Sequence, residues 1–215
     1  MKNIQIKNSK SAIVLFSGGQ DSTTCLYWAK QNFQNIFALG FYYNQKHDVE
    51  LKQAKKIAER ADIDFKIIDI DLTIIENGTK NQYDFIKVRN SIFFLLASNF
   101  ANQNNIENIV AGMCKSDYAN YPDCRLDFLN KIRECANLSI ENNIEFHFPL
   151  LQLSKAEVWK LGKELNILNI IINDTHTDYN GDRENLNEWG YGSLDNLASI
   201  MRAEGFKEAK KNRWI

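Results

Sequence analysis

A short polar turn near the start of the chain has the composition of an anion-binding loop. Its residues are Ser17, Gly18, Gly19, Gln20, Asp21 and Ser22. The two glycines let the backbone approach an anion closely, and the serine hydroxyls add donors. A helix that begins at the turn supplies aligned N–H groups and a partial positive charge. Asp21 would repel a bare phosphate, so we expect it to hold Mg²⁺ against one. These features predict a phosphate-binding loop.

Two other interpretations of this turn are weaker. A turn that is rich in small residues by chance would give the same letters, but the combination is rare at ordinary glycine and serine usage. The segment is also not a Walker A loop, since GxxxxGK[ST] is missing, and the chain has no GxGxxG fingerprint. The three histidines show no metal-ligand spacing such as HExxH, so we expect structural roles for them.

The composition limits the class of protein. The chain has 215 residues, of which 44% are hydrophobic, enough for one domain with a core. No apolar run reaches 18 residues and the first ten residues are polar, so we expect neither a membrane span nor a signal peptide, and a cytoplasmic location. The net charge of −1 gives no general attraction to nucleic acid. The four cysteines form no CxxC pair, so their spacing indicates no zinc site.

Apolar strands alternate with helical patterns along most of the chain. We expect strands at 12–16, 36–41, 65–70, 108–112 and 145–148, and helices at 22–31, 47–61, 90–101, 125–138 and from 155 onward. Ser154 and Glu157 form a capping box before the last of these helices. This order predicts an α/β fold, a doubly wound and mostly parallel sheet with helices on both faces. We expect a main domain over 1–172 and a small helical appendage over 173–215.

Several segments resemble one known family. The turn at 17–22 resembles the PP-loop of the ATP pyrophosphatases. Residues 41–47, 88–90, 148–150 and 155–157 resemble segments of the 7-cyano-7-deazaguanine synthases of the queuosine pathway, and 117–125 (DYANYPDCR) is close to that family's most specific signature. The resemblance covers residues 12–165. It implies a Rossmann-like PP-loop fold, related to the adenine nucleotide alpha hydrolases.

The resemblance also implies a reaction. The family converts 7-carboxy-7-deazaguanine, ammonia and ATP into 7-cyano-7-deazaguanine through an adenylated intermediate, as a carbon–nitrogen ligase. The expected cofactors are ATP and Mg²⁺, and the expected partners are small molecules, with no stable nucleic-acid binding. A homodimer is left open. Three alternatives also remain: a paralogue that stops at the amide, one that adenylates another carboxylate, and a non-catalytic nucleotide or deazaguanine sensor. A tRNA-thiolating relative would need placed reactive cysteines, which the spacing does not provide.

The expected site residues follow from the matching segments and from the rule that ligands bind beyond the carboxyl ends of parallel strands. The nucleotide-binding residues are Phe16, Ser17, Gly18, Gly19, Gln20, Asp21, Ser22 and Thr23. The substrate-binding residues are Tyr43, Gln45, His47, Arg89, Asn90, Asp117, Tyr118, Tyr121, Asp123 and Arg125. The catalytic residues are Asp21, Arg89 and Lys155. Structural alternatives stay open for three of these: a surface charge at Arg89, a helix N-cap at Asp123 and a solvated lysine at Lys155.

The C-terminal segment departs from the family. The family ends in a four-cysteine zinc site, a lone cysteine followed by a CxxCxxC cluster. Aligning at 179–181 puts Asp178 at the lone cysteine, and Trp189, Gly192 and Asp195 at the cluster. We therefore expect no zinc. In its place we expect a plug of buried aromatic residues, with a final helix docked by its apolar face. The plug would comprise Tyr179, Trp189, Tyr191, Phe206 and Trp214, and the helix face Leu194, Leu197, Ala198 and Met201.

Overall fold

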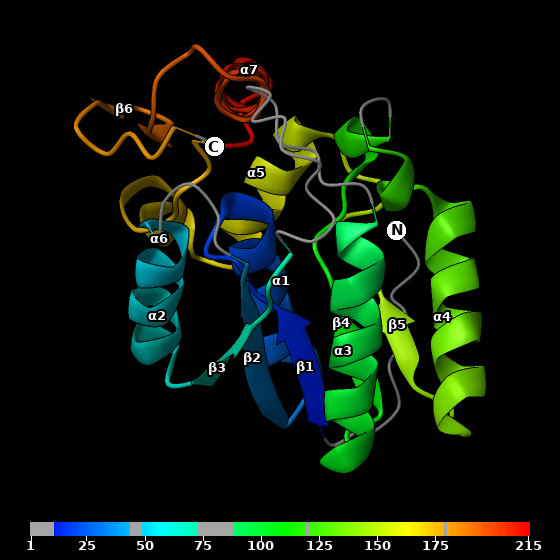
Figure 1. Cartoon of the computed structure of the whole chain (residues 1–215). Helices are drawn as coiled ribbons and strands as arrows, with labels where there is room; N and C mark the ends of the chain where they lie inside the picture. Colours follow the sequence, from blue (N-terminus) through cyan, green and yellow to red (C-terminus); the bar gives the residue numbers. More distant parts are fainter. Residues whose placement is uncertain (1–10, 44–48, 73–87, 119–120, 179) are drawn as a thin grey trace.

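A five-stranded parallel sheet forms the centre of the molecule (Figure 1). The structure is a computed structural model that describes residues 11–43, 49–72, 88–118, 121–178 and 180–215. The strands are β1 (Ser11–Leu15), β2 (Asn35–Tyr42), β3 (Asp64–Asp69), β4 (Asn108–Val110) and β5 (Glu145–His147). Their spatial order is β3-β2-β1-β4-β5. The chain first winds from β1 toward β3 and then crosses to β4, so the order reverses between β1 and β4. In such sheets the ligand crevice lies at this reversal, beyond the carboxyl ends of the strands.

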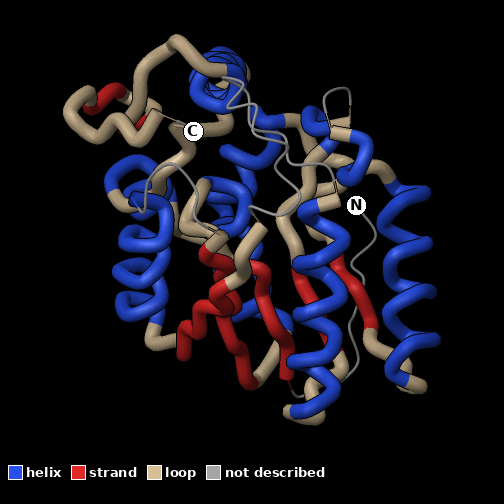
Figure 2. Tube along the Cα trace, viewed as in Figure 1, coloured by secondary structure: helices blue, strands red, loops and turns tan. Residues whose placement is uncertain are grey.

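Helices cover both faces of the sheet (Figure 2). They are α1 (Gln20–Asn32), α2 (Val49–Ala61), α3 (Arg89–Gln103), α4 (Leu126–Ile140), α5 (Lys155–Glu164), α6 (Leu168–Asn173) and α7 (Leu197–Lys211). Side chains alternate along β1: Ala12 and Val14 pack with α1, α2 and α5, whereas Ile13 packs with α3 and α4. Both cores are apolar, which explains why the strands read as continuous hydrophobic runs. The expected α/β, doubly wound parallel sheet is confirmed.

Some elements differ from expectation. β4 ends at Val110, two residues early, because the chain turns there toward the loop after β1: a Cβ on Gly112 would lie 3.0 Å from the Asp21 carbonyl carbon. The short helix α6 and the hairpin β6–β7 (Leu186–Asn187 and Gly190–Tyr191) were not predicted. Six residues are too few for a helical period to show, and two-residue strands have no alternation to detect. The loop expected at 73–83 lies outside the described residues.

The C-terminal segment packs on α5. The rings of Trp159 and Phe206 meet edge to face at 5.0 Å, and Trp159 Nε1 donates to the Arg202 carbonyl at 3.1 Å. A Cβ on Gly205 would lie 2.6 Å from Lys155 Cβ, so α7 lies directly on the first turn of α5. The expected domain boundary after residue 172 falls inside α6 and stays a prediction. In the described ranges, no helix has both the length and the apolar character needed to cross a bilayer.

The docking face of the last helix differs from the predicted one. Leu194 precedes α7 and is exposed, as is Leu197. The buried face of α7 is instead formed by Ser199, Arg202, Ala203, Gly205, Phe206 and Ala209. The predicted helix exists, but its apolar positions were assigned to the wrong side because a polar serine and an arginine belong to the buried stripe.

The capping box before α5 is confirmed. Ser154 Oγ accepts from Glu157 N at 3.3 Å, and Ser154 N donates to Glu157 Oε2 at 2.8 Å. Ser154→Ala should lower the free energy of unfolding by about 1 kcal/mol, because the first turn of α5 loses its cap. Urea unfolding measures this change. Ser154→Thr keeps a capping hydroxyl and should stay close to wild type; an equal loss in both variants would show that the cap is not the cause.

Candidate active site

The loop between β1 and α1 has the geometry of an anion site. β1 ends with Phe16 N donating to the Leu39 carbonyl at 2.8 Å. Gly18 has φ +85°, and a Cβ there would lie 2.7 Å from Ala54 N, so only glycine fits. The N-cap of α1 is Gly19, which has no side chain that could cover the first N–H groups of the helix. The positive end of the helix dipole therefore opens at the carboxyl edge of the sheet.

Polar side chains in the first turn of α1 are buried without a hydrogen bond. Among the described residues, no partner reaches either polar atom of the Gln20 amide, Asp21 Oδ1 or Thr23 Oγ1. Buried polar groups are almost always paired in folded proteins, so each such atom needs an explanation. Ser17 and Ser22, in contrast, lie hydroxyl to hydroxyl at 3.2 Å. A bound ligand at the loop would satisfy the unpaired atoms.

A lysine joins this loop to the loop after β4. Lys155, the first residue of α5, places Nζ 2.5 Å from Asp21 Oδ2 and 3.6 Å from Asp117 Oδ1. Asp117 ends a short 3-10 turn (Lys115–Asp117), and its second oxygen accepts from Cys114 N at 2.9 Å. The interpretation of Lys155 as a solvated surface lysine is wrong: its side chain is only 15% exposed.

The charged groups in this cluster shift one another's pKa values. Burial lowers the pKa of Lys155, but the Asp21 and Asp117 carboxylates outweigh it and hold that pKa well above its ordinary value. The pKa of Asp21 is raised by burial, which the nearby Lys155 ammonium opposes and the Asp117 charge reinforces. Burial also raises the pKa of Cys114 to about 12, so this thiol stays protonated. The cluster therefore places the Lys155 ammonium group between the carboxyl groups of Asp21 and Asp117.

Arg89 and Asp123 form a second charged region at the same edge of the sheet. Arg89 opens α3, donates from Nη1 to Tyr43 Oη at 3.2 Å and lies 5.9 Å from the centre of the Phe93 ring. Burial raises the pKa of Asp123, and the charge of Arg89 opposes this rise. Neither oxygen of the buried Asp123 has a hydrogen-bond partner in the described part of the chain. The surface-charge interpretation of Arg89 is thus not supported.

The helix-cap interpretation of Asp123 is wrong. Asp123 lies inside a 3-10 turn (Pro122–Cys124), and the N-cap of α4 is Arg125. Arg125 itself is exposed, and its Nε donates to the Tyr118 carbonyl at 3.1 Å, so it braces the loop. The Tyr118 hydroxyl is buried and unpaired among the described residues, and burial raises its pKa.

The remaining expected residues divide into two groups. Asn90 and Tyr121 are half-buried, in the first turn of α3 and in the loop after β4. Gln45 and His47 lie outside the described residues. The structure thus gathers the predicted residues that it describes at one edge of the sheet, on the loop after β1, the end of β2, the start of α3, the loop after β4 and the start of α5. Their roles stay a prediction.

Sequence reasoning missed a segment, residues 174–178, that lies on the phosphate loop. We call this segment the strap. His176 N donates to the Gly18 carbonyl at 3.1 Å, and Gln20 N donates to Thr177 Oγ1 at 3.4 Å. Arg202 is fully buried and donates from Nη1 to the same Thr177 oxygen at 2.9 Å. Burial lowers the pKa of Arg202 to about 9, against the nearby Asp21 charge. No spacing signal joins residues so far apart in sequence.

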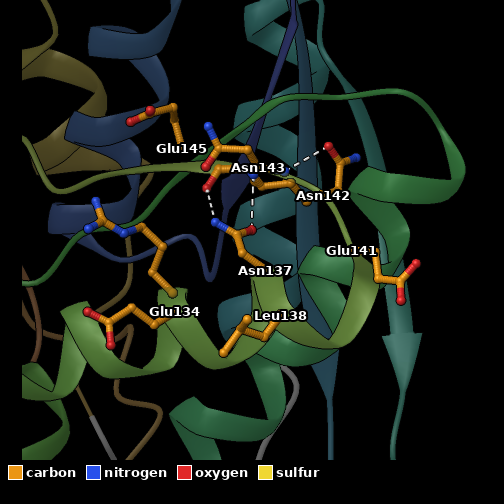
Figure 3. A pocket seen from close by; sticks show the side chains of 9 residues that line it. Glu134, Asn137, Leu138, Glu141, Asn142, Asn143 and Glu145 are labelled. Carbon is orange, nitrogen blue, oxygen red and sulfur yellow. Dashed lines mark hydrogen bonds between the residues drawn. The ribbon is translucent and has the colours of Figure 1, made fainter.

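A surface depression of about 1010 Å³ lies at the opposite end of the sheet (Figure 3). It is formed by the second half of α4 and the start of β5, and its lining includes Glu134, Asn137, Leu138, Glu141 and Glu145. The Asn137 amide pairs with the backbone of Ile144 in both directions at 3.0 Å. Since this amide fixes the turn into β5, and the depression lies at the amino ends of the strands, it does not belong to the candidate site.

Comparison with known proteins identifies the family. The family model described as "Queuosine biosynthesis protein QueC" matches residues 11–210. The chain belongs to this family. A 7-cyano-7-deazaguanine synthase of Wolinella succinogenes is 36% identical, over 94% of this chain and 94% of that protein. A synthase of the same name from Bacteroides fragilis is 38% identical, over 94% of this chain and 98% of its own length. As a QueC family member, the chain is an enzyme of queuosine biosynthesis, of the ATP-dependent ligase class.

Solved structures confirm the fold class. A 4-thiouridine synthetase–RNA complex with bound ATP is 17% identical with a TM-score of 0.55, covering 94% of this chain and 53% of that one. NMN synthetase from Francisella tularensis is 16% identical with a TM-score of 0.55, and the match covers 96% of this chain and 87% of that one. At these identities the likeness concerns the fold alone. The expected PP-loop fold is confirmed, and the QueC family membership implies ATP as a substrate.

The Lys155 cluster generates a stability prediction. Lys155→Met removes the cation between two largely buried carboxylates and should lower the free energy of unfolding by about 3 kcal/mol at neutral pH. Without the ammonium, the pKa of Asp21 rises further in the folded protein. The deficit should therefore shrink as the pH falls and the carboxylates become protonated.

Urea unfolding at pH 8 and pH 5 measures this dependence. Lys131→Met is the matched control, since Lys131 pairs with Glu134 on the exposed surface of α4 at 2.9 Å and such pairs contribute little. A deficit that is the same at both pH values, or equal in the two variants, would contradict the assignment of a buried ion cluster.

Proposed function

We propose that this chain converts 7-carboxy-7-deazaguanine, ammonia and ATP into 7-cyano-7-deazaguanine. The observation that carries the proposal is the ion cluster in which Lys155 joins Asp21 of the phosphate loop to Asp117 of the segment 117–125. One side of this cluster suits a nucleotide, and the other side carries the buried Asp123. The names of the two relatives support the same reaction.

The reaction needs activation twice. The carboxylate is a poor electrophile, since the electron-rich pyrrole ring donates into it. Its oxygen would attack the α-phosphorus of ATP and release pyrophosphate, and ammonia would then displace AMP to give the amide. In the second round the amide oxygen would attack the α-phosphorus of a second ATP and release a second pyrophosphate. Loss of AMP and protons leaves the nitrile.

The phosphate loop would bind the departing pyrophosphate. Apart from Gln20 N, which donates to Thr177 Oγ1, the N–H groups in the first turn of α1 and the hydroxyls of Ser17 and Ser22 would be the donors for its oxygens. Mg²⁺ fits Asp21 Oδ1, the oxygen that Lys155 leaves unpaired, and would neutralise charge on the phosphates. Cys114 and Asp117 also lie within 4.8 Å of Asp21, but a protonated thiol is a poor Mg²⁺ ligand, and both Asp117 oxygens already have partners in Lys155 Nζ and Cys114 N. Lys155 would hold Asp21 in place and balance its charge.

The base would be recognised on the other side of the cluster. A 7-deazaguanine presents a ring N–H and an amino group on one edge, and one carboxylate can accept from both. Asp123 has two unpaired buried oxygens for this role. Tyr118, or Tyr121 of the same loop, would stack on the ring. Arg89 would pair with the substrate carboxylate or a phosphate, as guanidinium groups do.

Further features of the proposal concern cofactors, location and partners. We include Mg²⁺ with ATP and no zinc. We place the enzyme in the cytoplasm, where the free thiols of Cys25, Cys114, Cys124 and Cys135 suit a reducing compartment. We also propose small molecules as its partners without stable nucleic-acid binding, and a homodimer stays open.

Turnover with 7-carboxy-7-deazaguanine tests the function. Purified protein with ammonia, ATP and Mg²⁺ should release AMP and pyrophosphate, detected by phosphorus NMR, and yield the nitrile by mass spectrometry. Accumulation of the amide would favour the paralogue that stops there. Activity with another carboxylate only would overturn the substrate assignment. Binding without turnover would favour a sensor, and ADP with phosphate would contradict the PP-loop chemistry.

Asp123→Asn tests base recognition. Asparagine replaces an anionic acceptor by a group with its own N–H donors, which should cost about 1.5–3 kcal/mol of transition-state binding, so kcat/KM for the deazaguanine should fall about 13- to 160-fold. Because burial raises the Asp123 pKa, wild-type kcat/KM should also decline as the pH falls through that raised value. The variant should lack this acidic limb.

Steady-state kinetics between pH 5 and 8 measures both effects. Asp127→Asn changes an exposed aspartate in the first turn of α4 and is the matched control. If Asp123→Asn and Asp127→Asn behave alike, the base is recognised elsewhere.

A further inference from the structure

Three residues spaced three apart meet one buried carboxylate in the C-terminal segment. Asp178 Oδ2 accepts from Ser193 Oγ at 3.0 Å, Asn196 Nδ2 at 2.9 Å and Ser199 Oγ at 3.0 Å. It also accepts from the Ser193 backbone at 2.9 Å, while Oδ1 accepts from Asn180 N at 2.7 Å. Asp178 and Ser199 are fully buried. We call these four residues (178, 193, 196 and 199) the Asp178 cluster.

The spacing of the cluster matches the pattern of the zinc site in this family. One position lies apart, and three follow at intervals of three, as in a lone cysteine and CxxCxxC. The match at 179–181 put Trp189, Gly192 and Asp195 at the last three positions, whereas the residues that meet Asp178 in the structure are Ser193, Asn196 and Ser199. Trp189 uses its carbonyl on Arg202, and Gly192 has no side chain. Asp195 is exposed at the rim, where it accepts from Asn196 Nδ2 and shares the single hydroxyl proton of Ser193 with Asp178.

The cluster residues do not fit zinc. Zinc in proteins is bound by thiolates, imidazoles and carboxylates, commonly four of them. Among the four residues only Asp178 belongs to these classes, and Oδ2 already accepts four hydrogen bonds. Burial raises the pKa of Asp178, but the bonds from Ser193, Asn180, Asn196 and Ser199 outweigh it and lower that pKa below its ordinary value. The cluster is complete as a hydrogen-bonded anion.

We propose that the Asp178 cluster replaces the family's zinc with a metal-free anchor that holds residues 174–178 on the phosphate loop. His176 and Arg202 connect the Asp178 cluster to that loop. His176 Nε2 donates to the Asp178 carbonyl at 2.8 Å, and His176 N bonds Gly18. Arg202 follows Ser199 by one turn of α7 and holds Thr177, which accepts from Gln20 N. Asp178 is thus a positioning residue for the nucleotide site.

The aromatic plug that we expected is a second part of this anchor. Trp189 and Phe206 are buried, and Tyr191 and Trp214 are half-buried, while Tyr179 lies outside the described residues. The carbonyl of Trp189 accepts from Arg202 Nε at 3.0 Å. The Trp189 ring centre lies 6.0 Å from the Arg202 guanidinium, whereas Tyr191 lies against Arg183 and Trp214 against Lys160. Of these rings, Trp189 is the one that covers the buried cation.

Cysteine substitution tests the assignment of the four positions. The variant Asp178→Cys/Ser193→Cys/Asn196→Cys/Ser199→Cys should bind one zinc per chain, and with Co²⁺ it should show thiolate-to-cobalt absorption. The control Asp178→Cys/Trp189→Cys/Gly192→Cys/Asp195→Cys should bind none tightly. Zinc in the control but not in the first variant would overturn the assignment, as would the absence of stoichiometric binding by the first variant refolded with zinc.

Two measurements on the unmodified chain and a single variant complete the test. Elemental analysis should find far less than one zinc per chain, and chelator should leave the melting temperature unchanged; one tightly bound zinc overturns the proposal.

Asp178→Asn should raise the Kd of ATP about five- to tenfold. Calorimetry at a temperature well below the melting temperature of the variant measures this change. Zinc-loaded four-cysteine protein should restore wild-type affinity. Asp182→Asn, in the same loop, is the control. Unchanged ATP affinity in Asp178→Asn would refute the positioning role, whether or not the proposed reaction is correct.

Discussion

The ion cluster of Lys155, Asp21 and Asp117 is the constraint on which the candidate site depends. Each member comes from a different part of the chain, the start of α1, the loop after β4 and the start of α5. The cluster can form only where these parts meet, beyond the carboxyl ends of β1 and β4. The topology puts the reversal of strand order there, so the charges lie where an open α/β sheet leaves space for a ligand. The parallel sheet thus brings opposite charges close enough to offset much of the cost of burying them.

Much of the fold could be predicted because each signal was local. The apolar run at 12–16 indicates a strand buried on both faces, and the capping box at Ser154 fixes the start of α5. The phosphate loop was also local, since its glycines, its serines and the following helix are contiguous. Expected and observed ends of the main helices agree within a few residues.

The rest depended on contacts that no local pattern contains. Lys155 was weighed as a solvated lysine, because nothing in the first turn of a helix tells that two carboxylates from elsewhere will face it. The buried face of α7 was missed for the same reason: Arg202 belongs to the core only because three acceptors, from Ile171, Thr177 and Trp189, converge on it. In the C-terminal segment no cysteine marks the positions that correspond to the zinc ligands of the family, so the sequence could not indicate that Ser193, Asn196 and Ser199 meet Asp178.

The strap across the phosphate loop also sets an order of events during synthesis. Parts near the N-terminus of a chain are made and begin to fold first. The sheet strands and α1 are complete before residue 176 exists, yet the Gly18 carbonyl and the Gln20 N–H find their partners only in His176 and Thr177. Arg202, which holds Thr177, is made later still. A nascent chain therefore lacks these contacts of the nucleotide site until α7 has been translated, and termination within α7 before Arg202 would remove the side chain that holds Thr177.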